Sequence, residues 1–412
     1  MNKDIRYLLF DWGDTLMRDD PQATGAMCDW PEVAAMPGVA AFLPRLAEKY
    51  TCVVLSNAVE SDAVLMEKAF ERVELAGCFH AFLTAKELGA RKPDTAFFTQ
   101  ALQMLGAKAE NAVTIGNDYA KDIVPAKAIG LGTILITNEV GEYPLADTVV
   151  KDFNGLLFLL QASINQKAWE YRADEYWNRT PPADKAASLR RDPLGRFHFH
   201  RAHFDNGQVR GKRIANPCGS NGRMAVPLAM LGAEVTVFDI SEEGKRYALA
   251  LAEAAGVSIG YVLGDFAETD LTVHGNMYDI VFAEGGILHY FADLPAFTRM
   301  LHAITKPGGR LILSDFHPFR KINAAGSPMM CVPQTENDYF DARIHSIPVA
   351  FQGAFAEEEQ ENFPLCLLRF YTISDILNAV LRAGYTVETF QEHPSFEDGK
   401  LPGFFTILAR KG

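Results

Sequence analysis

The stretch Phe10-Asp11-Trp12-Gly13-Asp14-Thr15-Leu16 decides how the first half of the chain is interpreted. It overlaps an apolar run, Tyr7-Leu8-Leu9-Phe10, whose composition predicts a buried strand. Asp11 then lies at the carboxyl end of that strand, where open α/β sheets place their ligand sites. An aspartate in that position can attack phosphorus and form an aspartyl phosphate. An acidic strand cap is the alternative interpretation of this residue.

Three later segments favour phosphate chemistry. Val53-Val54-Leu55-Ser56-Asn57 predicts a strand that ends in a hydroxyl and an amide, both able to hydrogen-bond a phosphoryl oxygen. Arg91-Lys92-Pro93-Asp94 contains a lysine suited to neutralise phosphate charge. Val113-Thr114-Ile115-Gly116-Asn117-Asp118 predicts a strand that runs into an acidic loop, with Asp122 shortly after it. A turn serine and a surface lysine are the alternative interpretations of the hydroxyl and the ammonium group.

The nucleophile, hydroxyl, lysine and acidic pair, in this order and at strand ends, resemble the four motifs of the haloacid dehalogenase (HAD) superfamily. The resemblance covers roughly residues 1–162 and implies a Rossmann-like, magnesium-dependent phosphatase domain. It implies that Asp11 is the nucleophile and that Ser56 and Lys92 hold the phosphate. It further implies that Mg²⁺ is bound by the nucleophile, by the carbonyl of Gly13 and by Asp118.

The first motif departs from the family at one position. Gly13 replaces the second aspartate, which normally protonates the leaving group, and loss of a general acid costs roughly a hundredfold or more in rate. Asp14 is adjacent but is expected to point elsewhere, and Asp122 is expected to support the site or to favour a helix N-terminus. The short segments on both sides of Ser56 leave room only for a minimal cap. The phosphatase is therefore expected to be slow, selective for its leaving group, or vestigial.

Composition limits the classes of function. A length of 412 residues predicts two or three domains, and 48% apolar with 22% charged residues is typical of a soluble globular protein. A net charge of −13 argues against a nucleic-acid partner. No signal-peptide core, membrane-length apolar run or metal-binding cysteine spacing is present, so a cytoplasmic protein with reduced thiols and no membrane partner is expected. The six cysteines are Cys28, Cys52, Cys78, Cys218, Cys331 and Cys366.

The second half starts a new strand, turn and helix unit. Asn216-Pro217-Cys218-Gly219-Ser220-Asn221-Gly222 predicts a tight turn, and the strand Glu234-Val235-Thr236-Val237-Phe238-Asp239 ends in an acid roughly twenty residues later. This is the layout of a nucleoside cofactor site, in which the acid holds the ribose hydroxyls. Asp265-Phe266 follows a third predicted strand and is a candidate to recognise an adenine. Lys306-Pro307-Gly308-Gly309 predicts the turn into a fifth strand.

This succession resembles a class I S-adenosylmethionine (SAM)-dependent methyltransferase over roughly residues 211–412. With the bridge at 163–210, it defines a second domain at 163–412. The resemblance implies a seven-stranded sheet that ends in a hairpin, with a substrate lid at about 316–367, and SAM as cofactor. The residues expected to contact the cofactor are Cys218, Gly219, Ser220, Asn221, Asp239, Ile240, Asp265, Phe266 and Glu284.

The glycine turn departs from the family. Ala215 and Pro217 stand where the family has an acid before its first glycine, and Asn221 stands where a third glycine is usual. Asparagine tolerates the left-handed backbone better than most residues, so a cofactor pocket is still expected. Its usual anchor for the amino group of the cofactor is missing from the sequence.

Methyl transfer gains much of its rate from alignment, and a base is sometimes needed. Glu284, His289 and His317 lie near predicted strand ends and are base candidates, with structural roles as the alternative. After Phe282 the sequence reads Ala-Glu-Gly-Gly instead of the Asn/Asp-Pro-Pro-Tyr of many enzymes that methylate nitrogens of nucleic acids and proteins. This difference and the acidic net charge favour a small-molecule acceptor.

The sequence as a whole predicts two doubly wound α/β domains: a HAD-like domain with a minimal cap, followed by a class I methyltransferase domain. Sequential work on one small metabolite would explain the fusion. In a second hypothesis only the methyltransferase is catalytic, and the HAD half serves binding or assembly. A third, non-phosphate HAD chemistry such as dehalogenation, is disfavoured by Lys92 and by the acidic pair Asp118 and Asp122. The oligomeric state is not predicted.

Overall fold

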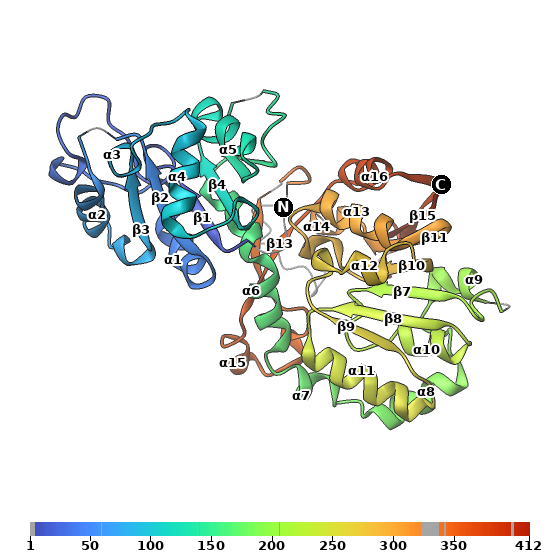
Figure 1. The fold of residues 1–412 in the computed structure, drawn as a ribbon. Helices are drawn as coiled ribbons and strands as arrows, with labels where there is room; N and C mark the ends of the chain where they lie inside the picture. The colour runs from blue at the N-terminus through green and yellow to red at the C-terminus, as the bar shows by residue number, and fades with distance from the viewer. Residues whose placement is uncertain are drawn as a thin grey trace. The chain divides into compact units, whose positions relative to one another are not determined.

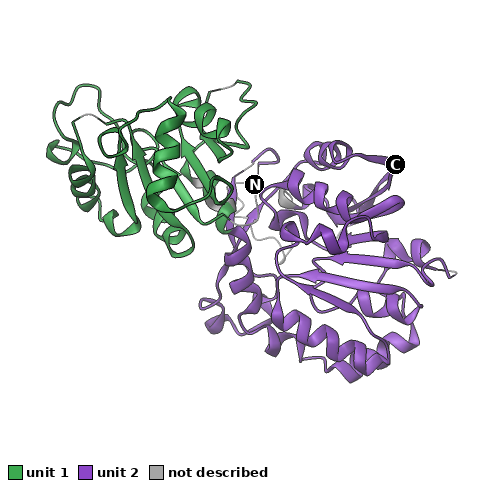
Figure 2. Cartoon of the chain, in the orientation of Figure 1, with its two compact units in different colours: residues 1–160 green, residues 161–412 purple. Residues whose placement is uncertain are grey.

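The computed structural model describes residues 5–58, 60–139, 141–205, 207–322, 338–341, 343–396 and 399–412. Within them the chain forms two compact units, residues 1–160 and 161–412, drawn in separate colours in Figure 2. Each unit contains its own sheet and its own hydrophobic cores. The prediction of two α/β domains is therefore confirmed.

The first unit is built on a parallel six-stranded sheet in the order β3-β2-β1-β4-β5-β6 (Figure 1). The central strands are apolar on both faces because helices cover the sheet on both sides, as parallel sheets require. The strands are β1 (Tyr7–Phe10), β2 (Thr51–Ser56), β3 (Ala81–Thr84), β4 (Ala112–Gly116), β5 (Gly132–Ile136) and β6 (Thr148–Val150). The helices are α1 (Val39–Lys49), α2 (Ala63–Glu71), α3 (Ala85–Leu88), α4 (Thr95–Leu105) and α5 (Val124–Ala128).

The segments that flank β2 are short, as predicted. Residues 11–50 contain one 3₁₀ turn and α1, and the described part of 57–91 contains α2, a 3₁₀ turn, β3 and α3. The segment after β4 forms a π-helical turn (Tyr119–Ile123) followed by α5. Asp118 caps the turn, and Pro125 in the first turn of α5 lacks the N–H that a continuous helix would use.

The second unit is built on a seven-stranded sheet in the order β14-β15-β11-β10-β7-β8-β9. The strands from β11 to β9 are parallel, while β15 and β14 form an antiparallel hairpin, which confirms the predicted topology. The strands are β7 (Arg213–Pro217), β8 (Glu234–Asp239), β9 (Gly260–Leu263), β10 (Tyr278–Glu284), β11 (Thr305–Phe316), β14 (Tyr385–Pro394) and β15 (Pro402–Lys411).

Helices cover both faces of this sheet (Figure 1). On one side lie α8 (Pro182–Arg191), α10 (Ala225–Met230) and α11 (Glu242–Ala255). On the other lie α12 (Leu271–His274), α13 (Leu294–Ile304) and α16 (Ile373–Arg382). The remaining elements are α6 (Phe158–Glu170), α7 (Ala173–Trp177), α9 (Arg201–Phe204), β12 (Ile344–Pro348), α14 (Phe319–Ile322), α15 (Glu357–Gln360) and β13 (Leu365–Arg369).

The predicted lid region contributes an antiparallel pair, β12 and β13, to the second unit; residues 323–337 and 342 of that region lie outside the described residues. Buried amides of α6 hold β13. Oδ1 of Asn165 accepts the N–H of Leu367 at 2.7 Å, and Nε2 of Gln161 donates to the Leu367 carbonyl at 2.9 Å. Oε1 of Gln161 accepts the N–H of Ala292. The same helix thus satisfies backbone groups of two distant segments.

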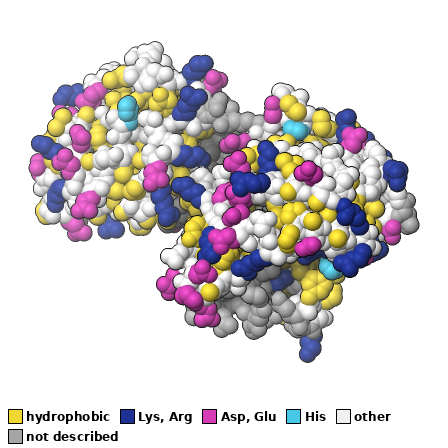
Figure 3. Space-filling model, turned by 90° about the horizontal axis from the view of Figure 1, so that it is seen from below, with side chains coloured by type: hydrophobic (Ala, Val, Ile, Leu, Met, Phe, Trp, Pro, Cys, Tyr) yellow, Lys and Arg dark blue, Asp and Glu magenta, His cyan; other side chains and the backbone are white. Residues whose placement is uncertain are grey.

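Two further expectations concern the whole chain. Cys28, Cys52, Cys78, Cys218 and Cys366 are free thiols, and Cys331 lies outside the described residues. Among the described helices, none has both the length and the hydrophobicity of a membrane span. On the face drawn in Figure 3, acidic and basic side chains are interspersed instead of forming one basic patch.

We expect Asn165→Leu to destabilise the second unit by about 1–3 kcal/mol, because the buried N–H of Leu367 loses its acceptor. Thermal unfolding should show the transition of that unit lowered by several degrees. Lys167→Leu, an exposed site on the same helix, is the control and should leave the transition unchanged. Equal midpoints for Asn165→Leu and the native chain would show that this contact does not stabilise the unit.

Candidate functional site

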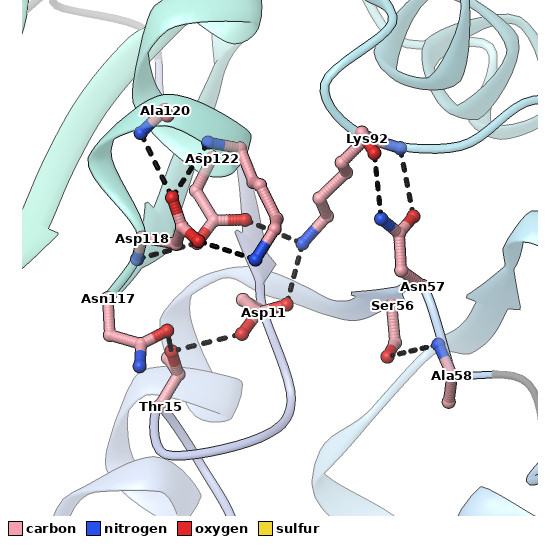
Figure 4. A network of polar contacts seen from close by, with 11 residues as sticks. Asp11, Thr15, Ser56, Asn57, Ala58, Lys92, Asn117, Asp118, Ala120 and Asp122 are labelled. Atoms are coloured by element: carbon pink, nitrogen blue, oxygen red, sulfur yellow. Dashed lines mark hydrogen bonds and ion pairs between the residues drawn. The ribbon is translucent and has the colours of Figure 1, made fainter.

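A buried lysine lies between two carboxylates at the carboxyl edge of the first sheet (Figure 4). Nζ of Lys92 is 2.6 Å from Oδ1 of Asp11, which follows β1, and 2.7 Å from Oδ1 of Asp122, in the turn after β4. The side chains of Lys92 and Asp122 are 3% and 2% exposed, whereas that of Asp11 is 18% exposed. The structure therefore brings the predicted nucleophile and lysine together and leaves the nucleophile accessible.

Two features fix this arrangement. The side chain of Asn57 accepts the N–H of Lys92 at 2.8 Å and donates to its carbonyl at 2.9 Å, so one amide satisfies both backbone groups. Gly116, the last residue of β4, has no room for a side chain because the Asp122 carboxylate lies against it. A β-carbon on Gly116 would be 2.2 Å from Oδ2 of that carboxylate. Sequence reasoning treated Asn57 only as a phosphate donor and gave Gly116 no role.

The charges stabilise one another. Burial alone would lower the pKa of Lys92, but Asp11 and Asp122 outweigh it and raise the pKa, so the ammonium group is protonated. Burial raises the pKa of Asp122 to about 6, and the nearby Asp11 adds to this, while Lys92 opposes it. The cluster thus places the Lys92 ammonium group between the carboxyl groups of Asp11 and Asp122.

Side-chain oxygen atoms of Thr15, in the same turn, and of Asn117, in the loop after β4, lie beside Asp11 (Figure 4). The hydroxyl oxygen of Thr15 lies 3.4 Å from Oδ2 of Asp11 and 3.2 Å from Oδ1 of Asn117. One hydroxyl proton serves only one of these acceptors at a time. Neither Thr15 nor Asn117 was named as a site residue from the sequence. The neighbouring acid, Asp118, was named instead.

Asp118 makes different contacts. Its Oδ1 accepts the N–H groups of Ala120 and Lys121 at 3.0 Å each, and its Oδ2 is 2.7 Å from Nζ of Lys121. The carboxylate thus caps the π-helical turn, and these bonds lower its pKa although burial opposes them. Ser56, the other predicted phosphate ligand, is buried at the end of β2, and its Oγ accepts the N–H of Ala58 at 3.0 Å.

The donor set beside Asp11 fits a hard cation. No group of three or more His, Cys, Asp and Glu side chains converges as a metal site within the described ranges. Mg²⁺, however, needs few protein ligands, because it takes oxygen donors and keeps several waters. Asp11 and Asn117 supply a carboxylate and an amide oxygen on either side of Thr15, and the Gly13 carbonyl belongs to the same turn.

In the second unit, the loop between β7 and α10 has a left-handed backbone at three positions. Cys218, Ser220 and Gly222 have φ of 54°, 44° and 72°. Asp239 holds this loop from the end of β8. Its Oδ2 accepts the N–H of Ser220 and its Oδ1 that of Ser241, both at 2.9 Å. A carboxylate has about four acceptor positions, so Asp239 retains capacity for ligand hydroxyls.

From the sequence, glycine positions of the family were expected at Gly219 and Asn221. In the structure the left-handed residues begin at Cys218, one residue earlier. Two residues before Cys218 lies Asn216, which is 1% exposed and donates through Nδ2 to the carbonyl of Phe282 at 2.9 Å. Its Oδ1 is buried and has no hydrogen-bond partner among the described residues. A β-carbon on Gly219 would lie 2.4 Å from that atom, so the loop can approach it only through glycine. Asn216 is therefore a candidate anchor that the sequence did not reveal.

The other predicted cofactor residues differ in their contacts. Oδ1 of Asp265 accepts the N–H of Ala267 at 2.9 Å. The Phe266 ring lies in the core against Phe238 and Phe297, with ring centroids 5.6 and 5.4 Å away. The carbonyl of Ile240 accepts from Gln166 at 3.0 Å. Asn221 Oδ1 lies 3.4 Å from the N–H of Arg223.

Two of the three candidate bases, Glu284 and His289, lie at the end of β10 and in the loop that follows it. Oε1 of Glu284 is 3.5 Å from Nη2 of Arg223. Desolvation lowers the pKa of His289 to about 4, so its imidazole is neutral at pH 7. Asp315 supports this loop by accepting the N–H groups of Ile287 and Leu288 at 2.9 and 2.7 Å.

Asp315 was not singled out in the sequence, and burial raises its pKa to about 6. The third base candidate, His317, is buried and lies 3.0 Å from Oε1 of Glu392, an ion-pair geometry that favours a structural role.

Comparison with known proteins agrees with this division. The model of the haloacid dehalogenase-like hydrolase family matches residues 21–136, and a methyltransferase domain model matches residues 217–313. A glyceraldehyde 3-phosphate phosphatase of Methanothermobacter thermautotrophicus is 35% identical over 78 residues, 18% of this chain and 34% of that protein. A ubiquinone biosynthesis O-methyltransferase of Methylobacterium nodulans is 39% identical over 92 residues, 22% of this chain and 35% of that protein.

The chain thus spans about a third of the length of these two curated relatives. Among solved structures, a SAM-dependent methyltransferase from Mesorhizobium loti matches with a TM-score of 0.39 and 22% identity, over 52% of this chain and 97% of that one. The two family matches fall in different structural units, and each covers strands of that unit's sheet. The chain is a fusion of a haloacid dehalogenase-like hydrolase domain and a methyltransferase domain.

Proposed function

We propose that the chain is a bifunctional enzyme that combines a magnesium-dependent phosphomonoesterase with a SAM-dependent methyltransferase acting on a small metabolite. The observation that carries the first activity is the buried Lys92, held between Asp11 and Asp122 beside an accessible nucleophile. The relative named as a glyceraldehyde 3-phosphate phosphatase supports a small phosphate ester as substrate.

Each group of the first site has a part in phosphoryl transfer. Oδ of Asp11 attacks phosphorus and the ester oxygen leaves, and water then hydrolyses the aspartyl phosphate. The Lys92 ammonium has three donors, two of which Asp11 and Asp122 occupy, so one remains for a phosphoryl oxygen. Ser56 Oγ already accepts the N–H of Ala58, so its own proton is available for the phosphate.

Mg²⁺ would be held by Asp11, the Gly13 carbonyl and a third oxygen from the adjacent pair Asn117 and Asp118. When bound, it neutralises phosphate charge. Asn117 is the favoured third ligand because it already lies beside the Thr15 hydroxyl, whereas Asp118 is engaged with Lys121. Using Asp118 instead would require breaking that ion pair.

The second site supports SAM binding through groups of one sheet edge. Asp239 retains acceptor capacity for the ribose hydroxyls after it binds the loop. The orphaned Oδ1 of Asn216 is a candidate acceptor for the amino group of the cofactor. His289, whose imidazole is neutral, and Glu284 are candidate bases that would take a proton from the methyl acceptor. The relative named as an O-methyltransferase supports a small-molecule acceptor.

We expect the native chain to hydrolyse p-nitrophenyl phosphate only with Mg²⁺, and Asp11→Asn to reduce turnover to background because the nucleophile is lost. Phosphate release is the measurement, and an unchanged thermal unfolding transition of the first unit in the variant is the control for folding. Asn117→Ala should raise the Mg²⁺ concentration for half-maximal rate more than Asp118→Ala does.

Three outcomes would contradict parts of this proposal. A larger effect of Asp118→Ala would assign the third ligand to Asp118. Full activity of Asp11→Asn would contradict the nucleophile, and an inactive native chain would favour the alternative in which the first domain serves binding or assembly.

For the second domain we expect Asp239→Asn to weaken SAM binding by about ten- to a hundredfold, because a hydrogen bond to a charged acceptor contributes about 1.5–3 kcal/mol. Calorimetric titration measures this. Glu234→Gln, at the exposed start of the same strand, is the control. Burial raises the pKa of Asp239 to about 6, and the ionised form is the better acceptor. The SAM affinity of the native chain should therefore fall as the pH is lowered through about 6, and that of Asp239→Asn should fall less. Equal SAM affinities of Asp239→Asn and the native chain at neutral pH would contradict the assignment.

A further inference from the structure

The first motif lacks a group that its chemistry needs. In the family that this domain resembles, the residue two after the nucleophile protonates the leaving group, and here that residue is Gly13. An alkoxide is a poor leaving group, so without an acid the hydrolysis of alkyl phosphates is slow. A carboxyl group that reaches the same place from elsewhere in the chain would supply the missing proton.

The carboxylate of Asp19 lies next to that place. A β-carbon built on Gly13 would lie 3.5 Å from Oδ2 of Asp19 and 3.8 Å from its Cβ and Cγ. These three atoms are the nearest neighbours of the missing side chain. Gly13 is not in the left-handed region, so its backbone does not require glycine. The volume into which an aspartate at position 13 would extend thus adjoins the carboxylate of Asp19.

The turn after β1 brings Asp19 there. Asp14 has a left-handed backbone with φ of 54°, and its N–H donates to the carbonyl of Met17 at 2.7 Å. A β-bridge joins Gly13 to Met17. Oδ1 of Asp14 then accepts the N–H of Asp19 at 3.1 Å. The sequence neighbour Asp14 therefore positions Asp19.

The next carboxylate along the chain is engaged differently. Oδ1 of Asp20 accepts the N–H of Gln22 at 2.9 Å, in a local turn. Asp20 is not among the nearest neighbours of a β-carbon at position 13. Both Asp19 and Asp20 are exposed, so accessibility does not distinguish them, and only their placement relative to Gly13 does. This difference makes Asp20 a matched control.

We propose that Asp19 is the general acid and base of the phosphatase site, supplying the carboxyl group that Gly13 lacks; this inference rests on the proposed phosphatase function. Oδ of Asp11 forms a bond to phosphorus while the ester P–O bond breaks. The electron pair of that bond stays on the leaving oxygen, which takes the proton of Asp19.

Water then attacks phosphorus and gives a proton to the Asp19 carboxylate. The bond from phosphorus to Asp11 breaks, and Asp11 leaves as a carboxylate. Ester and water become alcohol and phosphate, and Asp19 returns to its starting protonation.

The test compares two phosphate esters that differ in their leaving group. p-Nitrophenolate leaves without a proton, whereas the alkoxide of propyl phosphate needs one. We expect Asp19→Asn to lower kcat/KM for propyl phosphate by about a hundredfold or more and to change that for p-nitrophenyl phosphate only a few-fold. Asp20→Asn should leave both rates unchanged. The double variant Gly13→Asp/Asp19→Asn restores the residue that the family has at position 13. Its kcat/KM for propyl phosphate should be at least tenfold higher than that of Asp19→Asn.

Several results would overturn the proposal. An equal loss on both esters would make Asp19 a structural residue, and no loss on either would exclude it as the acid. A failure of Gly13→Asp to restore alkyl phosphate hydrolysis, with p-nitrophenyl phosphate activity intact, would also count against it. If the native full-length chain hydrolyses neither ester with Mg²⁺, the phosphatase function itself fails and the inference fails with it.

Discussion

The first domain depends on the buried ammonium group of Lys92, whose charge is balanced by the carboxylates of Asp11 and Asp122. Removing Lys92 from water is costly, and the structure offsets this cost with ion pairs of 2.6 and 2.7 Å to Asp11 and Asp122. These three residues come from the end of β1, the loop before α4 and the turn after β4. The cluster therefore holds the carboxyl edge of the sheet in one arrangement, and the Asn57 amide fixes the lysine backbone. A phosphate ligand would meet charges that are already in place, which is the basis of electrostatic catalysis.

The second domain uses carboxylates at strand ends in a related way. Asp239 and Asp315 each accept backbone N–H groups of a neighbouring loop, and burial raises the pKa of both to about 6. One holds the turn around Ser220, and the other holds the loop that carries His289. Because the loops have few regular hydrogen bonds of their own, these acids determine their course at the sheet edge.

The apolar runs and their acidic ends predicted strands with ligand sites at their carboxyl ends. The terminal hairpin and the meeting of Asp11 with Lys92 followed from the resemblance to the two families, and the structure agrees with both. The rest depended on turn geometry, which residue types alone do not determine. The resemblance implied Asp118 as the metal ligand, yet the structure engages Asp118 in a helix cap. Cys218 and Ser220 adopt left-handed backbone that glycine usually occupies, which hid the position of Asn216.

The central claim is that Asp11 becomes phosphorylated during turnover. The most direct measurement is to quench the full-length chain while it hydrolyses p-nitrophenyl phosphate with Mg²⁺ and to reduce it with borohydride. Reduction converts an aspartyl phosphate into homoserine, which mass spectrometry locates in the chain. We predict homoserine at position 11, dependent on substrate and Mg²⁺ and missing from Asp11→Asn. Steady turnover with an unmodified Asp11, or with homoserine at another aspartate, would contradict the account.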